Sequence, residues 1–245
     1  MTIFEAEWRA RFERFGRSYA EEHFVSGWSP AGLARRFSLF EQLIGHLALP
    51  VGSRVLELGC GAGTYVRRLA ELGHSVVGID YALPSLGRAV EADPGRKGRY
   101  LAADGHELPF TPECFDLVVC IGVLQAVSRP GPLLDEMIRV LRPEGLLVVE
   151  ALNALEIPAL ARRLSEIAGG RRSRVRHDSP FEVCRALEQR KIRHLRRVGV
   201  YLLPRRFPRL GRILDSRGLI RLIEMVPGGS LVMAHAFWYV GRKSS

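Results

Sequence analysis

The chain has 245 residues, of which 47% are hydrophobic and 25% are charged. This length fits one α/β domain, or one domain with an appended cap. Its apolar runs stay shorter than the ~18 residues that a membrane-spanning helix needs. Because Glu5, Glu7 and Arg9 stand near the start, we expect no secretory signal peptide, and we expect a cytoplasmic protein.

The cysteines and the charge exclude further classes. Four cysteines form no Cys-x-x-Cys pair, so the sequence predicts no metal site and no disulfide framework. Residues 1–150 carry a net charge of −3, from 16 cations and 19 acids, whereas residues 151–245 carry +13, from 20 cations and 7 acids. The basic character therefore belongs to the C-terminal part. An arginine-rich composition can also follow from genomic base composition, so the asymmetry is the stronger observation.

The predicted elements begin with two helices. Aromatic residues recur at helical spacing in the first segment: Phe4, Trp8, Phe12, Phe15 and Tyr19. A second helix is expected to open at Ser29-Pro30, an N-cap followed by proline, and to run to about Leu47.

From Ser53 onward, short apolar runs alternate with helical stretches. The predicted strands are 54–58, 75–79, 99–103, 115–121 and 145–150, and the predicted helices are 64–72, 83–92 and 131–141. This alternation favours a parallel, doubly wound α/β sheet whose ligands lie at the carboxyl ends of its strands.

The pattern changes after Glu150. A helix over 156–168 is expected to end at Gly169-Gly170, and a basic loop with Arg171, Arg172, Arg174 and Arg176 follows. Further predicted elements are a helix from Ser179-Pro180, a strand over 192–203, a helix over 208–225 and a last strand over 231–240. We expect the last two strands to form an antiparallel edge.

The segment from Glu57 to Gly63 carries the most specific motif. A strand ends in an acid, and three alternating glycines precede a helix, giving Glu-x-Gly-x-Gly-x-Gly. Thr64 replaces the third glycine of the dinucleotide fingerprint, which disfavours a nucleotide-linked dehydrogenase. The Glu57 carboxylate suits a ligand with a cationic end better than a pyrophosphate.

Two more acids follow predicted strands. Asp80 ends the second strand, where a carboxylate can accept hydrogen bonds from ribose hydroxyls. Asp104 follows the third strand candidate. Three acids at three strand ends outline one pocket.

These residues carry a family resemblance over about 53–150. The chain resembles class I S-adenosylmethionine-dependent methyltransferases of the small-molecule type, such as those of quinone and natural-product pathways. The matching blocks are 57–63, Asp80, Asp104 with Leu108-Pro109-Phe110 and Phe115-Asp116-Leu117-Val118, and Arg139-Val140-Leu141-Arg142-Pro143-Glu144-Gly145.

The resemblance implies a Rossmann-like methyltransferase fold: a doubly wound, seven-stranded, mostly parallel sheet with an antiparallel last strand and a helical cap. It implies one domain over 1–245, with a helical lid at 1–50, a cofactor-binding core at 51–150, and a basic substrate cap with the sheet edge at 151–245. The cofactor would be S-adenosyl-L-methionine, leaving S-adenosyl-L-homocysteine as product. The residues that would bind it are Glu57, Gly59, Cys60, Gly61, Gly63, Asp80, Tyr81, Asp104, Gly105, His106 and Ile121.

The acceptor side is less defined. Relatives often have paired histidines where this chain has Gln125-Ala126, so no catalytic base carries over, and the weak candidates are Tyr19, His23 and His177. Gln125, Arg171, Arg172 and Arg174 are expected near the substrate, and the basic segment suits an anionic group. A second change, Pro-Glu-Gly at 143–145 where many relatives have Pro-Gly-Gly, is expected to alter only a turn.

The function that follows is methyl transfer to a small-molecule or lipid-like acceptor. An anionic acceptor would fit the basic segment. A helix of arginine and aliphatic residues near 205–223 also suits peripheral membrane contact. The alternatives are a non-catalytic cofactor-binding adaptor at a membrane or partner surface, and an RNA or protein methyltransferase. Nucleic acid ranks last, since no separate RNA-binding module is apparent.

Overall fold

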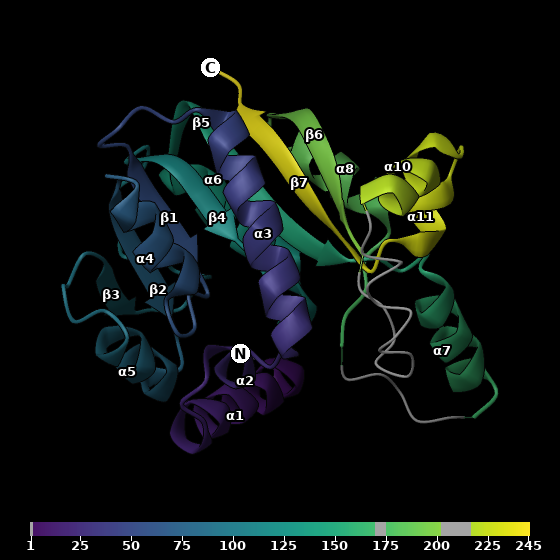
Figure 1. Cartoon of the computed structure of the whole chain (residues 1–245), viewed down its shortest axis with the longest axis horizontal. Coiled ribbons are helices and arrows are strands. Elements are labelled where there is room, and N and C mark those ends of the chain that lie inside the picture. Colours follow the sequence, from purple (N-terminus) through teal and green to yellow (C-terminus); the bar gives the residue numbers. More distant parts are fainter. Residues whose placement is uncertain (1, 170–174, 202–216) are drawn as a thin grey trace.

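A seven-stranded sheet forms the centre of the computed structural model, which describes residues 2–169, 175–201 and 217–245 (Figure 1). The strands lie in the order β3-β2-β1-β4-β5-β7-β6. Their bounds are β1 Arg54–Leu58, β2 Ser75–Asp80, β3 Arg99–Ala102, β4 Phe115–Cys120, β5 Leu141–Leu152, β6 Ile192–Val200 and β7 Ala236–Lys243. β1 to β5 pair in parallel, and β7 is antiparallel to both of its neighbours. The doubly wound sheet with its antiparallel last strand is confirmed.

Helices cover both faces of the sheet. Their bounds are α1 Ile3–Ser18, α2 Glu22–Val25, α3 Pro30–Leu47, α4 Thr64–Glu71, α5 Leu83–Glu91, the 3-10 turn η1 Leu124–Ala126, α6 Pro130–Val140, α7 Ile157–Ile167, α8 Pro180–Glu188, α10 Arg217–Met225 and α11 Gly229–Met233. Side chains of α3, α4 and α5 form one buried cluster with the sheet, and those of α6 and α8 form the other. None of the helices in the described ranges is long and apolar enough to cross a bilayer.

The helix α3 is tied to the sheet by a buried ion pair. Ser29 caps it by accepting from Gly32 N at 3.1 Å. Arg36 Nε donates to Glu150 Oε1 of β5 at 2.8 Å, and the two side chains are only 2% and 1% exposed. The Arg36 guanidinium also lies 4.6 Å from the centre of the Trp28 ring. A buried pair of this kind fixes position, because either charge alone would be costly to leave without its partner.

The helix α1 is held at both of its ends. At its start, Thr2 and Glu5 form a capping box, and Glu5 Oε1 accepts from Ser128 N and Ser128 Oγ in the loop after β4, at 3.1 and 2.7 Å. Near its end, Gly16 lies against α5 so closely that a Cβ would stand 2.6 Å from Ser85 N. Arg88 Nε also donates to Gly16 O at 3.0 Å. These contacts place α1 across the carboxyl ends of the central strands.

Several predicted boundaries were wrong. β5 begins at Leu141 rather than 145, because a register shift pairs Leu141 with Phe115 and takes the intervening turn residues into the strand. The last strand spans Ala236–Lys243 rather than 231–240, since the apolar run at 229–233 forms the short helix α11. β6 ends at Val200, before the end of the strand expected over 192–203. Of the helix expected over 208–225, α10 forms the part from Arg217, and the part before residue 217 lies outside the described residues.

Candidate functional site

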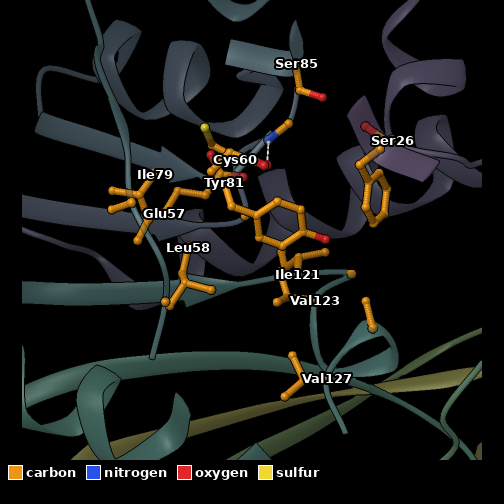
Figure 2. A pocket seen from close by; sticks show the side chains of 18 of the residues that line it. Ser26, Glu57, Leu58, Cys60, Ile79, Tyr81, Ser85, Ile121, Val123 and Val127 are labelled. Carbon is orange, nitrogen blue, oxygen red and sulfur yellow. Dashed lines mark hydrogen bonds between the residues drawn. The ribbon is translucent and has the colours of Figure 1, made fainter. Parts of the chain in front are cut away.

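A cavity of about 370 Å³ opens at the carboxyl ends of β1, β2 and β4. Figure 2 shows side chains from separate parts of the chain gathered around it, among them Glu57 from β1, Tyr81 after β2 and Val123 after β4. The helix α1 and the linker before α3 complete the wall, through residues such as Phe12 and Ser26. The pattern of acids at strand ends thus corresponds to one cavity, as expected for a parallel sheet.

The glycine loop between β1 and α4 owes its shape to positive φ angles. Gly59, Gly61 and Gly63 have φ of 75°, 51° and 77°. A Cβ on Gly59 would lie 2.2 Å from Val123 Cγ2, so this glycine lets the loop pack against the segment after β4. A Cβ on Gly63 would lie 2.8 Å from Tyr100 Cε1, and Gly63 is not part of the cavity lining. The structure therefore gives Gly63 a packing role.

Glu57 stands in the cavity wall with an unpaired oxygen. Its side chain is 2% exposed, and Glu57 Oε2 has no hydrogen-bond partner. Burial raises the pKa of Glu57 well above its usual value, and a hydrogen bond from the Val66 backbone and the charge of Arg67 only partly oppose this. A buried carboxylate oxygen without a partner is costly, so the wall is prepared for a cationic or hydrogen-donating ligand.

Asp80 is oriented by the loop that it faces. Its Oδ2 accepts from Gly61 N at 2.9 Å, and its Oδ1 accepts from Ala82 N at 2.8 Å. Burial raises the pKa of Asp80, and these backbone donors act in the opposite direction. Since each carboxylate oxygen can accept a second hydrogen bond, Asp80 presents two acceptors to a ligand in the cavity. Tyr81 lines the cavity beside it, and the Arg9 guanidinium of α1 lies 5.8 Å from its ring centre.

Asp104 and His106 form the third polar corner. Asp104 Oδ1 accepts from His106 N at 2.9 Å and lies 2.9 Å from His106 Nδ1. Burial acts to raise the pKa of Asp104, but the hydrogen bonds and charge of His106 outweigh it and lower the pKa. The carboxylate is therefore kept ionised, and His106 is committed to holding it.

The remaining wall is largely apolar. It is made by α1, α2, the linker before α3, the segment after β4 and α6, through Phe12, Val25, Trp28, Ile121, Val123, Ala126, Val127 and Leu133. One cavity thus has a polar part at the ends of β1, β2 and β3 and an apolar part beside β4.

The cavity includes ten of the eleven residues predicted to bind the cofactor, all except Gly63. The predicted acceptor-side residues are arranged differently. Tyr19 packs on Phe24, at 4.9 Å between ring centres, and His23 lines a separate shallow groove beside α4. His177 Nε2 lies 3.0 Å from Arg162 Nη2, outside the cavity lining.

Gln125 also lies outside the lining, and its carbonyl accepts from Arg176 N at 3.0 Å. Arg176 Nη1 donates to the carbonyl of Ser128 at 2.7 Å, so the connection before α8 supports the loop after β4. The predicted substrate residues Arg171, Arg172 and Arg174 lie outside the described residues.

Sequence reasoning missed the contribution of three residues before β1. Glu5, Arg9 and Trp28 line the cavity, although no motif marks them. The family resemblance implied that the first helix covers the site, and its aromatic stripe meets the cavity at Phe12, whereas Tyr19 follows the end of the helix outside the cavity lining.

Comparison with known proteins agrees with this geometry. Residues 56–149 match the family described as "Methyltransferase domain". Over these residues the chain is similar to a methyltransferase domain. An uncharacterized methyltransferase of Mycobacterium tuberculosis is 33% identical over 104 residues, covering 42% of this chain and 41% of the relative. A demethylmenaquinone methyltransferase of Clavibacter sepedonicus is 34% identical over 113 residues, covering 45% and 46%. The aligned part thus spans less than half the length of these curated relatives.

Solved structures extend the likeness of fold beyond the methyltransferase domain. Magnesium protoporphyrin IX methyltransferase from Synechocystis PCC 6803, solved with bound SAH, has a TM-score of 0.67 at 15% identity, covering 98% of this chain and 100% of that one. A SAM-dependent methyltransferase from Methanosarcina mazei has a TM-score of 0.62 at 20% identity, covering 82% and 97%. The Rossmann-like methyltransferase fold is therefore confirmed.

Proposed function

We propose that the protein transfers a methyl group from S-adenosylmethionine to a small, largely apolar acceptor. The observation that carries the proposal is the unpaired, buried Glu57 Oε2 in the wall of the cavity beside the glycine loop. A cationic ligand would supply the missing partner, and a pyrophosphate would be repelled.

The polar part of the cavity fits this cofactor. Glu57 would hold the ammonium group of its methionine part, and Asp80 would accept both ribose hydroxyls. Asp104, fixed by His106, would accept the amino group of adenine, with Tyr81 against the ring. When bound, the cofactor supplies a methyl group already activated by a sulfonium. The ten lining residues that the family resemblance implied support this assignment.

The apolar part would take the acceptor. Phe12, Trp28 and Val127 offer an aliphatic and aromatic wall that excludes water. Holding the acceptor atom about 3 Å from the methyl carbon supplies much of the acceleration of such a displacement. His106 is the histidine in the lining, and its Nδ1 faces Asp104. This arrangement favours an acceptor that is nucleophilic without a protein base.

The three predicted parts of the chain would each have a separate role in methyl transfer. Residues 1–50 would serve as the lid, since α1 contributes Glu5, Arg9 and Phe12 to the wall. Residues 51–150 would bind the cofactor, and residues 151–245 would form the cap beside the acceptor.

Two measurements test the proposal. S-adenosylhomocysteine, and not NADH, should raise the melting temperature, because a ligand at 100 times its Kd stabilises by about 2.7 kcal/mol. Labelled methyl from S-adenosylmethionine should then enter the lipid or the polar metabolite fraction of a cell extract. Stabilisation by NADH alone would refute the cofactor, and label in protein or RNA would refute the acceptor class. Cofactor binding without any label would favour an adaptor.

A further inference from the structure

The helix α7 exposes an apolar stripe. Its side chains Ile157, Leu160, Leu164 and Ile167 are spaced three or four residues apart, which places them on one helical face. All four are exposed, Leu164 and Ile167 by 68% and 76%. Ala159 is the one residue of α7 that is buried, so the stripe points away from the core.

A second exposed apolar group lies at the same end of the molecule. α10, α11 and the turn between them expose the aliphatic side chains Leu222, Met225, Val226, Val232 and Met233. Asn153, at the start of the connection to α7, donates to Leu231 O and Ala234 O at 2.7 and 2.8 Å. Figure 1 shows α7, α10 and α11 together beyond the end of β5. We call these nine side chains the aliphatic end.

The C-terminal part of the chain, to which the aliphatic end belongs, carries a positive net charge in its sequence. Residues 151–245 carry 20 cations and 7 acids. Within α7 and α10, Arg162, Arg163 and Arg221 are exposed beside the apolar side chains, and the same helices carry the acids Glu166 and Glu224. Long arginine side chains can leave their charge at the level of lipid headgroups while aliphatic neighbours enter the acyl boundary.

We propose that the aliphatic end docks on an anionic lipid bilayer. The nine side chains lie on α7, on α10 and α11 and on the turn between those two helices. None of them lines the cavity or the groove beside α4, so this surface has no hollow of its own and suits a deformable partner. Two copies of this chain would bring like charges together, whereas anionic headgroups complement the surplus of arginine. The proposal does not depend on the methyl-transfer function, because it concerns a different surface.

The test is co-sedimentation of the full chain with phosphatidylcholine vesicles, with and without phosphatidylglycerol. Binding should require the anionic lipid and weaken in high salt, since each arginine near the surface contributes about fivefold to partitioning. Leu164→Glu combined with Ile167→Glu should reduce partitioning at least about tenfold. Because both positions are exposed, the melting temperature and S-adenosylhomocysteine binding should stay unchanged.

A matched control is Val51→Glu combined with Val90→Glu, which changes exposed valines (83% and 50%) on other parts of the molecule. The control should bind vesicles like the unmodified protein. Equal loss of binding in both double variants, or no binding to anionic vesicles, would overturn the proposal. So would a dimer in sedimentation velocity that Leu164→Glu dissociates, because a second copy would then cover the surface.

Discussion

Replacing Glu57 by glutamine tests the central assignment of the site. The change keeps the shape of the side chain and an oxygen for the Val66 backbone, but it removes the negative charge that faces the cavity. A hydrogen bond to a charged group contributes roughly 1.5–3 kcal/mol. The affinity for S-adenosylhomocysteine should therefore fall by about 10- to 150-fold.

The same substitution should raise the stability of the free protein although it lowers the affinity for the ligand. The pKa of Glu57 is raised above 4.5 by burial, so its contribution to stability is fully present below that pH and declines as the pH rises toward the raised pKa. Near neutral pH, Glu57→Gln should therefore stabilise the free protein while weakening ligand binding.

Calorimetric titration from about pH 5 to about pH 8 measures both the affinity and the linked protons. In the unmodified protein the ligand should bind more tightly as the pH rises, with release of a proton, because the cationic ligand favours the ionised form of Glu57. The variant should show a flatter dependence. Equal affinity of the two proteins at every pH would refute the role given to Glu57.

Three other substitutions test the frame around the site. Glu5→Gln should speed amide exchange in α1 above pH 5. Burial alone would raise the Glu5 pKa, but the hydrogen bonds from Thr2 and Ser128 together outweigh it and lower the pKa to about 2, so in the unmodified protein the protection should fade as the pH drops from 4.5 toward that value. Gly59→Ala should lower the free energy of unfolding by about 1–3 kcal/mol, because its Cβ would lie 2.2 Å from Val123 Cγ2, and pairing it with Val123→Ala should recover part of the loss in denaturant titrations. Arg36→Met should cost about 3–5 kcal/mol by leaving Glu150 buried without its partner, and Arg36→Met with Glu150→Met should restore most of the melting temperature. Equal melting temperatures for that single and that double variant would contradict the view that the unpaired charge causes the loss.

The core could be predicted from sequence because its signals are local. Alternating apolar runs placed β1, β2 and β4 within about one residue of their bounds, and Ser29-Pro30 placed the start of α3. The glycines and the acids at the strand ends predicted the position of the cavity, since a parallel sheet brings the carboxyl ends of neighbouring strands to one edge.

The rest depends on contacts between distant parts of the chain. The sequence around Glu5 does not show that this residue anchors α1, because its hydrogen-bond partner Ser128 lies more than a hundred residues away. The aromatic stripe predicts a helix but not which part of it reaches the site: Phe12 lines the cavity, whereas Tyr19 lies beyond the end of α1. The short apolar run in α11 fits a strand or a helix equally, and only its tertiary surroundings decide between them.

Under the proposed function, the contacts of Ser128 would couple the binding of cofactor and acceptor. Its hydroxyl and amide donate to Glu5 of α1, while its carbonyl accepts from Arg176. Displacing α1 to exchange the cofactor would break the hydrogen bonds between Glu5 and Ser128. It would thereby loosen the loop after β4, whose Val127 lines the apolar part of the cavity. Since such coupling is reciprocal, a ligand that needs α1 in place gains affinity from a second ligand that orders the loop after β4, by the same factor as the reverse. Two compounds that share one cavity would thus bind cooperatively, through a serine that touches neither.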